Sequence, residues 1–310
     1  MVAPITGSIV PNSTQPTSST SRWSASPANY FWEVAKRENR SRARAAARPE
    51  SRGDSSTAAG GSKKLSEVLD TIICGDAVKE MRRLPDESVD LVVTSPPYNL
   101  KNSSGNGMKD GRGGKWSSAA LIQGYAKHDD NMPHEEYVEW QRACLAEMLR
   151  LIKPDGAIFY NHKWRVQNGL LQDRQDIVSG FPVRQIIIWR RKGGINFNAG
   201  YFLPTYEVIY LIAKPDFTLA PKANAVGDVW EFTQETNNEH PAPFPVGLIE
   251  RIIGSTTAEV VLDPFMGSGT TAVAARNLGR HFVGIELSAE YCKSARKRLS
   301  NLPPTLFARG

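Results

Sequence analysis

From residue 65 onwards, short apolar runs alternate with helical patterns along this chain of 310 residues. The runs that read as strands are residues 70–74, 89–94, 157–161, 184–189, 206–212, 260–262 and 281–285. Several of them lead into amphipathic segments, such as the one opened by Pro133, in which Tyr137, Trp140, Cys144, Leu145 and Met148 recur at spacings of three and four. This alternation predicts an α/β domain with a doubly wound, mostly parallel sheet covered by helices on both faces.

The first 64 residues have a different composition, rich in Ser, Thr, Pro, Ala and Arg. They hold ten of the 38 Lys and Arg residues and four of the 32 Asp and Glu residues, so the whole net charge of +6 falls there. Such a segment buries too little apolar surface to offset the loss of chain entropy. We therefore predict a disordered basic tail over residues 1–64 and one folded domain over residues 65–310.

Two segments of the predicted domain carry residues typical of chemistry. The strand at 89–94 ends in Ser95-Pro-Pro-Tyr98, the hook, whose prolines stop a strand because they lack an N–H and fix φ. The run Asp263-Pro-Phe-Met-Gly-Ser-Gly-Thr270, the glycine turn, links a strand to a helix. Gly267 and Gly269 permit a sharp turn and close approach of a ligand, and the helix N–H groups near Thr270 favour an anionic group.

An acid follows the glycine turn at the end of the next predicted strand. Glu286 is placed to bind ribose hydroxyl groups from the neighbouring strand tip. A GxG turn alone is weak, since it lacks the third glycine of a dinucleotide site and the lysine of a phosphate loop. Together the turn and the acid indicate an adenosine ligand.

Other features exclude classes of protein. No run of about 18 apolar residues predicts a membrane span, and no apolar leader begins the chain, so we expect a cytoplasmic protein. Cys74, Cys144 and Cys292 lie far apart, and the histidines show no ligand spacing, so no metal site is expected.

The two motifs together resemble those of the S-adenosylmethionine-dependent DNA amino-methyltransferases. The segment Thr94–Tyr98 resembles their catalytic motif, and the glycine turn their cofactor motif; 240–245 and Gly75-Asp76 resemble two further motifs. The catalytic motif comes first, which is the circularly permuted order of the family's beta group. The resemblance covers about residues 65–300 and implies a Rossmann-like class I methyltransferase fold.

The resemblance also implies roles for single residues. Ser95, Pro96, Pro97 and Tyr98 would be catalytic: Ser95 Oγ and the Pro96 carbonyl accept from the amine of a base, and Tyr98 stacks on it after base flipping. The residues that it implies for binding S-adenosylmethionine are Asp76, His240, Pro243, Phe244, Asp263, Phe265, Gly267, Gly269, Thr270 and Glu286. For the two phenylalanines, ordinary core packing is the alternative.

The acceptor base is cytosine at N4 or adenine at N6. Serine as the first residue of the hook favours cytosine within the family, although a hydroxyl and a carboxylate both accept from an amine. A cytosine C5 methyltransferase is excluded, because none of the three cysteines follows a proline. The remaining alternatives are an RNA or protein N-methyltransferase and a non-catalytic nucleic-acid-binding module.

Two basic, glycine-containing regions, about residues 101–130 and 190–240, are candidates for recognising double-stranded DNA. The residues proposed for DNA contacts are Lys101, Lys115, Arg190, Arg191, Asn196 and Asn198. The sequence leaves open the target site, a partner restriction enzyme in a restriction-modification system, and whether the chain is a monomer or a homodimer.

Overall fold

The computed structural model describes residues 63–99, 132–167, 169–191, 199–233 and 244–303. These ranges all belong to one structural unit, Asp54–Gly310, while the other unit, Met1–Gly53, lies outside them. The described residues form the helices α2 (Ala77–Met81), α3 (His134–Leu151), α4 (Gln175–Val178), α5 (Val246–Gly254), α6 (Thr270–Asn277) and α7 (Ala289–Ser300), with short 3-10 turns at Leu65–Glu67 and Ala223–Ala225. Their strands are β1 (Thr71–Cys74), β2 (Val89–Thr94), β3 (Ile152–His162), β4 (Arg165–Gln167), β5 (Leu170–Gln172), β6 (Val183–Arg190), β7 (Tyr206–Ala213), β8 (Val229–Glu231), β9 (Val260–Asp263) and β10 (His281–Glu286).

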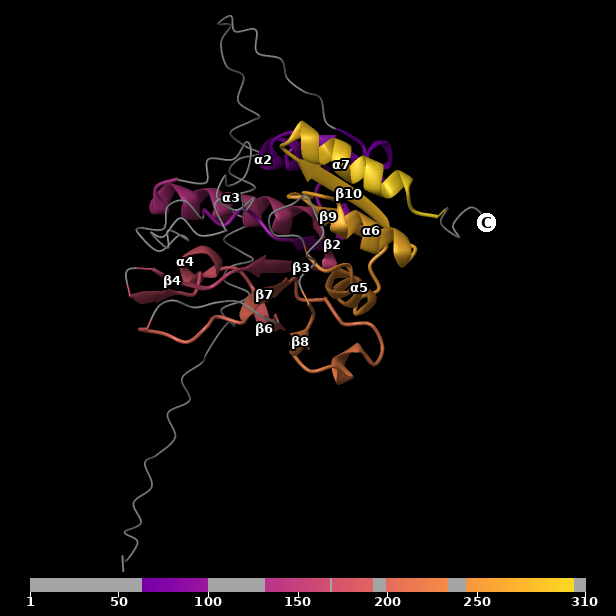
Figure 1. Cartoon of the computed structure of the whole chain (residues 1–310). Helices are drawn as coiled ribbons and strands as arrows, with labels where there is room; N and C mark the ends of the chain where they lie inside the picture. Colours follow the sequence, from indigo (N-terminus) through magenta and orange to yellow (C-terminus); the bar gives the residue numbers. More distant parts are fainter. Residues whose placement is uncertain (1–62, 100–131, 168, 192–198, 234–243, 304–310) are drawn as a thin grey trace, which may run out of the picture. The chain divides into compact units, whose positions relative to one another are not determined.

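Eight strands form one sheet in the order β1-β10-β9-β2-β3-β7-β6-β8, and β4 and β5 form a separate hairpin. Every pairing in the large sheet is parallel except the two made by β7. From β9 the chain moves outward through β10, whereas from β2 it moves the other way to β3, so the winding reverses between β9 and β2. The doubly wound, mostly parallel sheet expected from the sequence is confirmed (Figure 1).

The core consists of two apolar layers, one on each face of the sheet. Along β2, Leu91 and Val93 enter one layer and Val92 enters the other, as the alternation of strand side chains requires. The first layer contains buried residues of α5, α6 and α7, and the second contains those of α2, α3 and α4. Helices therefore cover both faces, and the ends of the strands stay available for a site.

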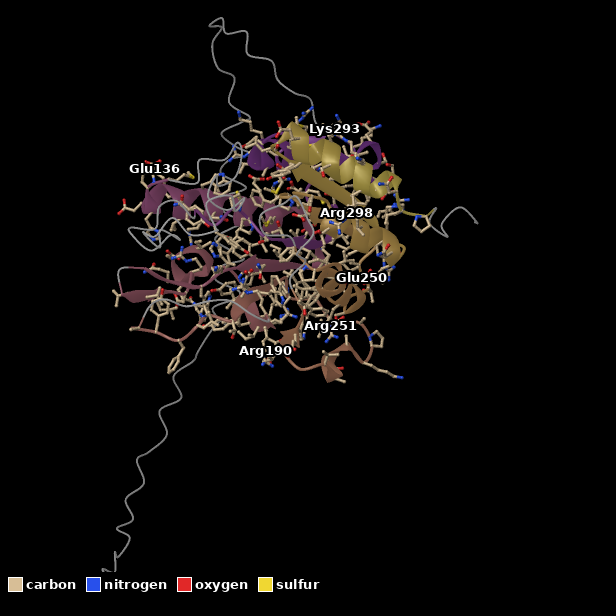
Figure 2. The ribbon with its side chains drawn as sticks, viewed as in Figure 1. Glu136, Arg190, Glu250, Arg251, Lys293 and Arg298 are labelled. Atoms are coloured by element: carbon tan, nitrogen blue, oxygen red, sulfur yellow. The ribbon has the colours of Figure 1, made fainter. Side chains whose placement is uncertain are left out.

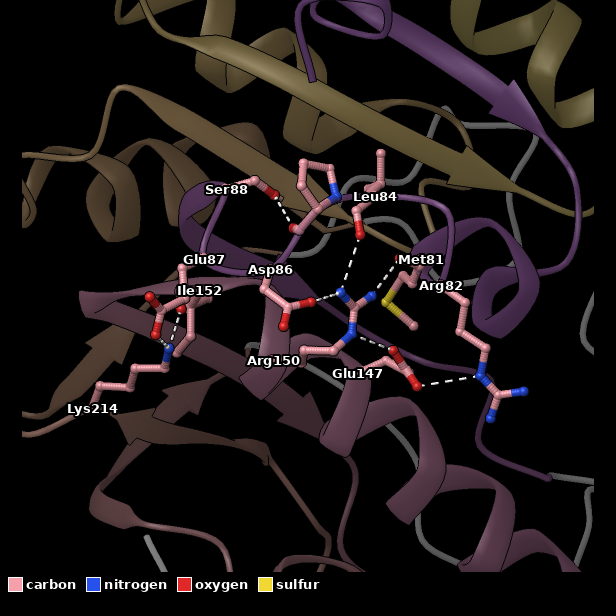
Figure 3. A network of polar contacts seen from close by, with 11 residues as sticks. Met81, Arg82, Leu84, Asp86, Glu87, Ser88, Glu147, Arg150, Ile152 and Lys214 are labelled. Carbon is pink, nitrogen blue, oxygen red and sulfur yellow. Dashed lines mark hydrogen bonds and ion pairs between the residues drawn. The ribbon is translucent and has the colours of Figure 1, made fainter. Parts of the chain in front are cut away.

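The C-terminal end of α3 is fixed to the turn that precedes β2. Arg150 donates to the carbonyl oxygens of Leu84 and Met81 at 3.0 and 2.7 Å and pairs with Glu147 at 2.8 Å (Figure 3). A guanidinium fork matches several oxygen acceptors at once, so these contacts fix the helix in direction as well as position. The N-terminal half of the same helix lies at the hook, where Tyr137 and Gln141 donate to the carbonyl oxygen of Pro97.

The observed strands extend most predicted ones by one to several residues, and β2 agrees with its predicted bounds. The structure adds elements that the sequence analysis did not predict, among them the β4–β5 hairpin, α4, α5 and β8. The predicted basic tail, apart from residues 63–64, and the whole of the predicted loop at 101–130 lie outside the described residues. Within the described ranges, no helix has the length and apolar character of a membrane span.

Candidate active site

The hook and the glycine turn follow neighbouring strands of the sheet. The strands that lead into them, β2 and β9, are parallel neighbours with Leu91 opposite Val261 and Val92 opposite Leu262. Parallel strands end at the same edge of a sheet, and the reversal of winding lies between these two. Segments about 170 residues apart in the chain thus form one candidate site at the switch point.

A buried hydrogen bond joins the ends of these two strands. Thr94, the last residue of β2, donates from Oγ1 to Asp263 Oδ1 at 2.8 Å. Asp263 also accepts from Thr271 Oγ1 at 2.6 Å and from the backbone N–H of Phe265 at 3.0 Å. Burial raises the pKa of Asp263 to about 6, although these three donors favour the charged form. The carboxylate is thus an internal link between the motifs, and the ligand contact implied by the resemblance stays a prediction.

The glycine turn has the backbone geometry that its sequence indicates. Gly267 and Gly269 have φ angles of 53° and 86°, in the left-handed region. A Cβ on Gly269 would lie 2.9 Å from Cβ of Ala295 in α7, so the turn and α7 pack too closely for a side chain. No side chain caps the start of α6 after Gly269, and Arg298 donates to Thr270 Oγ1 at 3.0 Å.

Glu286 ends β10 beside this turn, at the strand tip that the sequence analysis expected. Its Oε2 accepts from the backbone N–H of Gly267 at 2.9 Å, and its Oε1 accepts from that of Ser288 at 2.7 Å. Burial raises the pKa of Glu286, and the two backbone N–H groups act in the opposite direction. Each carboxylate oxygen can accept a further hydrogen bond, so the group can still serve hydroxyl donors.

The hook folds back on itself so that its first and last side chains touch. Ser95 Oγ and Tyr98 Oη are 2.6 Å apart, and Tyr98 Oη donates to Glu207 Oε2 of β7 at 3.1 Å. Asn161 of β3 donates from Nδ2 to Tyr98 Oη at 2.6 Å and to Glu207 Oε2 at 2.8 Å. Tyr98 is buried, with its ring centroid 4.8 Å from that of His162.

The backbone of the hook is held by the N-terminal half of α3. The carbonyl oxygen of Pro97 accepts from Tyr137 Oη at 2.9 Å and from Gln141 Nε2 at 3.1 Å. After the hook, Asn99 has a φ of 55° and exchanges two side-chain hydrogen bonds with the backbone of Met132. Donors from a fixed helix therefore supplement the prolines in setting the direction of the hook carbonyls.

Helix α3 also reaches the glycine turn through an aromatic contact. The ring centroid of Trp140 lies 5.6 Å from that of Phe265, at an interplanar angle of 62°. Phe244 packs against Trp189 at 6.0 Å and is buried in the first core layer, which is the packing alternative named for it. Asp76 accepts from the backbone N–H of Lys79 at 2.9 Å and so caps α2.

The residues suggested for DNA contacts differ in their surroundings. Arg190 is exposed and pairs with Glu231 of β8 at 2.8 Å (Figure 2). Arg191 has only 15% of its side chain exposed and pairs with Glu207 at 3.1 Å, so it faces the hook from behind. The structure thus gives Arg191 a protein partner that the sequence analysis did not foresee. Lys101, Lys115, Asn196, Asn198, His240 and Pro243 lie outside the described residues.

Several residues of the site were missed by the sequence analysis. They are Asn161 and His162 at the end of β3, Tyr137 and Gln141 on α3, and Glu207 on β7. One of them left a signal, because Glu207 is the only charged residue in the apolar run 206–213. A carboxylate in a strand that is otherwise apolar requires a buried partner, and such partners gather at functional sites.

Comparison with known proteins agrees with this arrangement. A family model described as DNA methylase, N6_N4_Mtase, matches residues 89–297. The type II methyltransferase M.BglII of Bacillus subtilis is 32% identical over 277 residues, which cover 76% of this chain and 70% of that protein. The type II methyltransferase M.HpaI of Haemophilus parainfluenzae is 29% identical over 256 residues, with 74% of each chain covered.

Solved structures share the fold. A putative DNA modification methylase of Thermus thermophilus, TTHA0409, complexed with S-adenosyl-L-methionine, is 25% identical with a TM-score of 0.54, over 74% of this chain and 93% of that one. The PvuII DNA methyltransferase (cytosine-N4-specific) has a TM-score of 0.57 at 20% identity, over 75% of this chain and 87% of that one. At that identity the second likeness concerns the fold alone.

Proposed function

The chain belongs to the N6/N4 family of DNA methylases, and from that membership we propose that it transfers a methyl group to N4 of cytosine in DNA. Adenine N6 is the alternative acceptor. The observation that carries the proposal is the juxtaposition of the hook and the glycine turn at the ends of β2 and β9. A cofactor held at the turn and a base held at the hook would meet at this edge.

S-Adenosyl-L-methionine is the methyl donor of this family, and the residues of the turn fit it. Gly267 and Gly269 leave the backbone bare where a ligand must approach closely, and the N-terminus of α6 suits a carboxylate. Glu286 keeps acceptor capacity for the ribose hydroxyls. The cofactor supplies an electrophilic methyl group when bound, and this chain must hold and orient the amine that receives it.

The hook suits an amine whose lone pair is conjugated with an aromatic ring. Acceptors aimed at its N–H protons make the nitrogen more tetrahedral and free the lone pair for attack. Ser95 Oγ is one such acceptor, and the carbonyl oxygen of Pro96 is proposed as the other. The contacts of α3 with Pro97 support this reading, because they fix the adjacent peptide before any substrate arrives.

Serine at the start of the hook is the reason for preferring cytosine. Within the family, serine at this position favours cytosine N4, whereas aspartate or asparagine favours adenine N6. The base must leave the duplex to reach the hook, since its amine is otherwise paired. Tyr98 is the proposed stacking partner, although its ring is buried against His162 and would have to be uncovered for the base.

A methyl-transfer assay on genomic DNA tests the proposal directly. The protein is incubated with DNA and S-adenosyl-L-methionine, and the nucleosides are separated after digestion and identified by mass spectrometry. We expect N4-methylcytosine. N6-Methyladenine would retain the reaction and overturn the choice of base. Methyl transfer to RNA or protein, with unmodified DNA, would overturn the proposed substrate.

A further inference from the structure

A buried carboxylate lies directly behind the hook. Glu207 projects from β7, next to β3, and only 6% of it is exposed. A buried acid is costly unless donors surround it, and here Arg191 pairs with Oε1 at 3.1 Å while Asn161 donates to Oε2 at 2.8 Å. The third partner is Tyr98 of the hook. Arg191 therefore holds one oxygen of the carboxylate, while Asn161 and Tyr98, a residue proposed as catalytic, both donate to the other.

The chemistry of these groups decides where the hydroxyl protons point. An ionised carboxylate only accepts, so the proton of Tyr98 Oη lies toward Glu207 at 3.1 Å. Tyr98 then has no proton left for Ser95, and the contact of 2.6 Å between the two hydroxyls requires Ser95 to donate. Ser95 Oγ then acts as an acceptor: Asn161 Nδ2 lies 3.4 Å from it, and its remaining lone pair can face the base. Asn161 favours the same order, because its Nδ2 donates to Tyr98 Oη.

We propose that Glu207, held by Arg191 and Asn161, is a positioning residue that directs the hydroxyl protons of Tyr98 and Ser95 inward, so that Ser95 Oγ faces the amine of the base as an acceptor. The inference rests on the proposed methylation of a base amine and holds for cytosine or adenine. Without an acceptor behind Tyr98, the Ser95 proton is free to point at the amine, where it opposes an N–H donor. A serine hydroxyl can either donate or accept a hydrogen bond, and the network thus fixes that of Ser95 as an acceptor.

The same chain of hydroxyls accounts for the proton that the amine must lose. When the C–N bond forms and the C–S bond breaks, the sulfur keeps the electron pair and the nitrogen gains a positive charge. One N–H proton passes to Ser95 Oγ, the Ser95 proton passes to Tyr98 Oη, and the Tyr98 proton passes to Glu207. The products are a neutral methylated amine and a neutral carboxyl group, and the proton later returns to solvent. No further reactant is needed.

Arg191 is assigned a second role by this arrangement. Its guanidinium lies on the side of Glu207 away from Tyr98, since it contacts Oε1 and Tyr98 contacts Oε2. The ion pair occupies Oε1 and leaves Oε2 to accept from Tyr98 and Asn161. Arg191 is thus a support for the hook, while Arg190, which is exposed, keeps the proposed contact with DNA.

The test uses Glu207→Gln, which keeps the size of the side chain. Its Oε1 must stay toward Arg191, so its NH2 group faces Tyr98 and donates. The order of protons along the chain then reverses. We expect kcat for methyl transfer to DNA to fall by roughly 10²-fold, in the range of a lost acid–base contribution, with the Kd for S-adenosyl-L-methionine unchanged. We also expect the single-turnover rate of the wild type to be slower in D2O than in H2O, and Glu207→Gln to lose this solvent isotope effect.

Glu147→Gln is the matched control, because Glu147 is also a largely buried acid that pairs with two arginines, Arg82 and Arg150, away from the hook. It should lower the melting temperature and leave kcat unchanged. Tyr98→Phe breaks the chain without altering Glu207, and the double variant Tyr98→Phe/Glu207→Gln should be no slower than the slower single variant.

Three results would overturn the inference. One is an unchanged kcat in a folded Glu207→Gln protein, and another is a double variant whose losses multiply. The third is a loss of kcat in Glu147→Gln as large as that in Glu207→Gln. If the wild type transfers no methyl group to DNA, the proposed function fails first. The wild-type assay therefore separates that failure from a failure of the role given to Glu207.

Discussion

Thr94 donates a buried hydrogen bond of 2.8 Å to Asp263, across 169 positions of sequence. Thr94 immediately precedes the hook, and Asp263 is the first residue of the glycine turn. The proposed catalytic and cofactor motifs are therefore joined through side chains as well as through the pairing of their strands. A change at either residue should alter the distance between a bound methyl donor and its acceptor.

Thr94→Val should weaken this connection with little change in side-chain volume. We expect a loss of about 1–2 kcal/mol in the free energy of unfolding, because a buried carboxylate loses one of its donors. The transfer rate should fall more than cofactor affinity does, since the hook moves while the turn keeps its other contacts. Urea denaturation and single-turnover methyl transfer measure the two effects.

Thr71→Val provides the comparison for that variant. The hydroxyl of Thr71 also donates to a protein oxygen, the carbonyl of Val68 at 2.7 Å, but at the outer edge of the sheet. It should change stability slightly and leave the transfer rate as it is. A slower transfer in Thr71→Val would show that any lost threonine hydroxyl disturbs catalysis, contrary to the specific link described.

The raised pKa of Asp263 predicts an unusual dependence of stability on pH. Burial raises its pKa to about 6 in the folded chain, above its ordinary value of 3.8. Between these values the folded chain binds more protons than the unfolded chain, so the contribution of Asp263 to stability decreases as pH rises. The unfolding free energy of the wild type minus that of Asp263→Asn should therefore decrease from about pH 4 to about pH 6 and remain level above that. Urea denaturation at several pH values measures it, and a rise over this interval would contradict the assignment.

Tyr98→Ala should separate binding of the base from binding of the cofactor. The variant removes the stacking face and the hydroxyl that contacts Ser95 and Glu207. We expect turnover to fall strongly, with cofactor affinity near that of the wild type, because Tyr98 lies in the hook and outside the glycine turn. Calorimetric titration with S-adenosyl-L-methionine and a transfer assay give the two quantities. Equal losses of both would mean that Tyr98 serves the whole site.

The sequence predicted the parts of the site that depend on local pattern. The hook and the glycine turn each follow a short apolar strand, and prolines and glycines restrict or free the backbone in ways visible in one segment. Their meeting at one edge agrees with the rule for parallel sheets, whose ligands bind beyond the carboxyl ends of the strands. Glu286 was found in the same way, because a strand tip has a defined position relative to the preceding turn.

The contacts behind the hook could not be predicted because they join distant segments. Glu207 is 109 positions from Tyr98, and no local rule says which buried side chain lies beside which. Arg191 was interpreted as a DNA contact because its neighbours are basic and glycine-rich, and the sequence does not reveal that it turns inward. The strands β4, β5 and β8 were missed because each has three residues, too few for a periodic pattern.

Gly269→Ala should be more harmful than its small size suggests. The residue has a φ of 86°, which an L-residue adopts only with strain, and the new Cβ would lie 2.9 Å from Cβ of Ala295. Gly169→Ala separates the backbone strain from the steric contact. Gly169 has a φ of 78°, but no heavy atom lies within 4 Å of the position that a Cβ would take. We expect about 1 kcal/mol of destabilisation from the strain in Gly169→Ala, and a larger loss in Gly269→Ala. Only Gly269→Ala should weaken binding of S-adenosyl-L-methionine, because the movement of α7 displaces the turn. Thermal unfolding and calorimetric titration of both variants decide this, and equal behaviour would show that the contact with Ala295 has no part in shaping the turn.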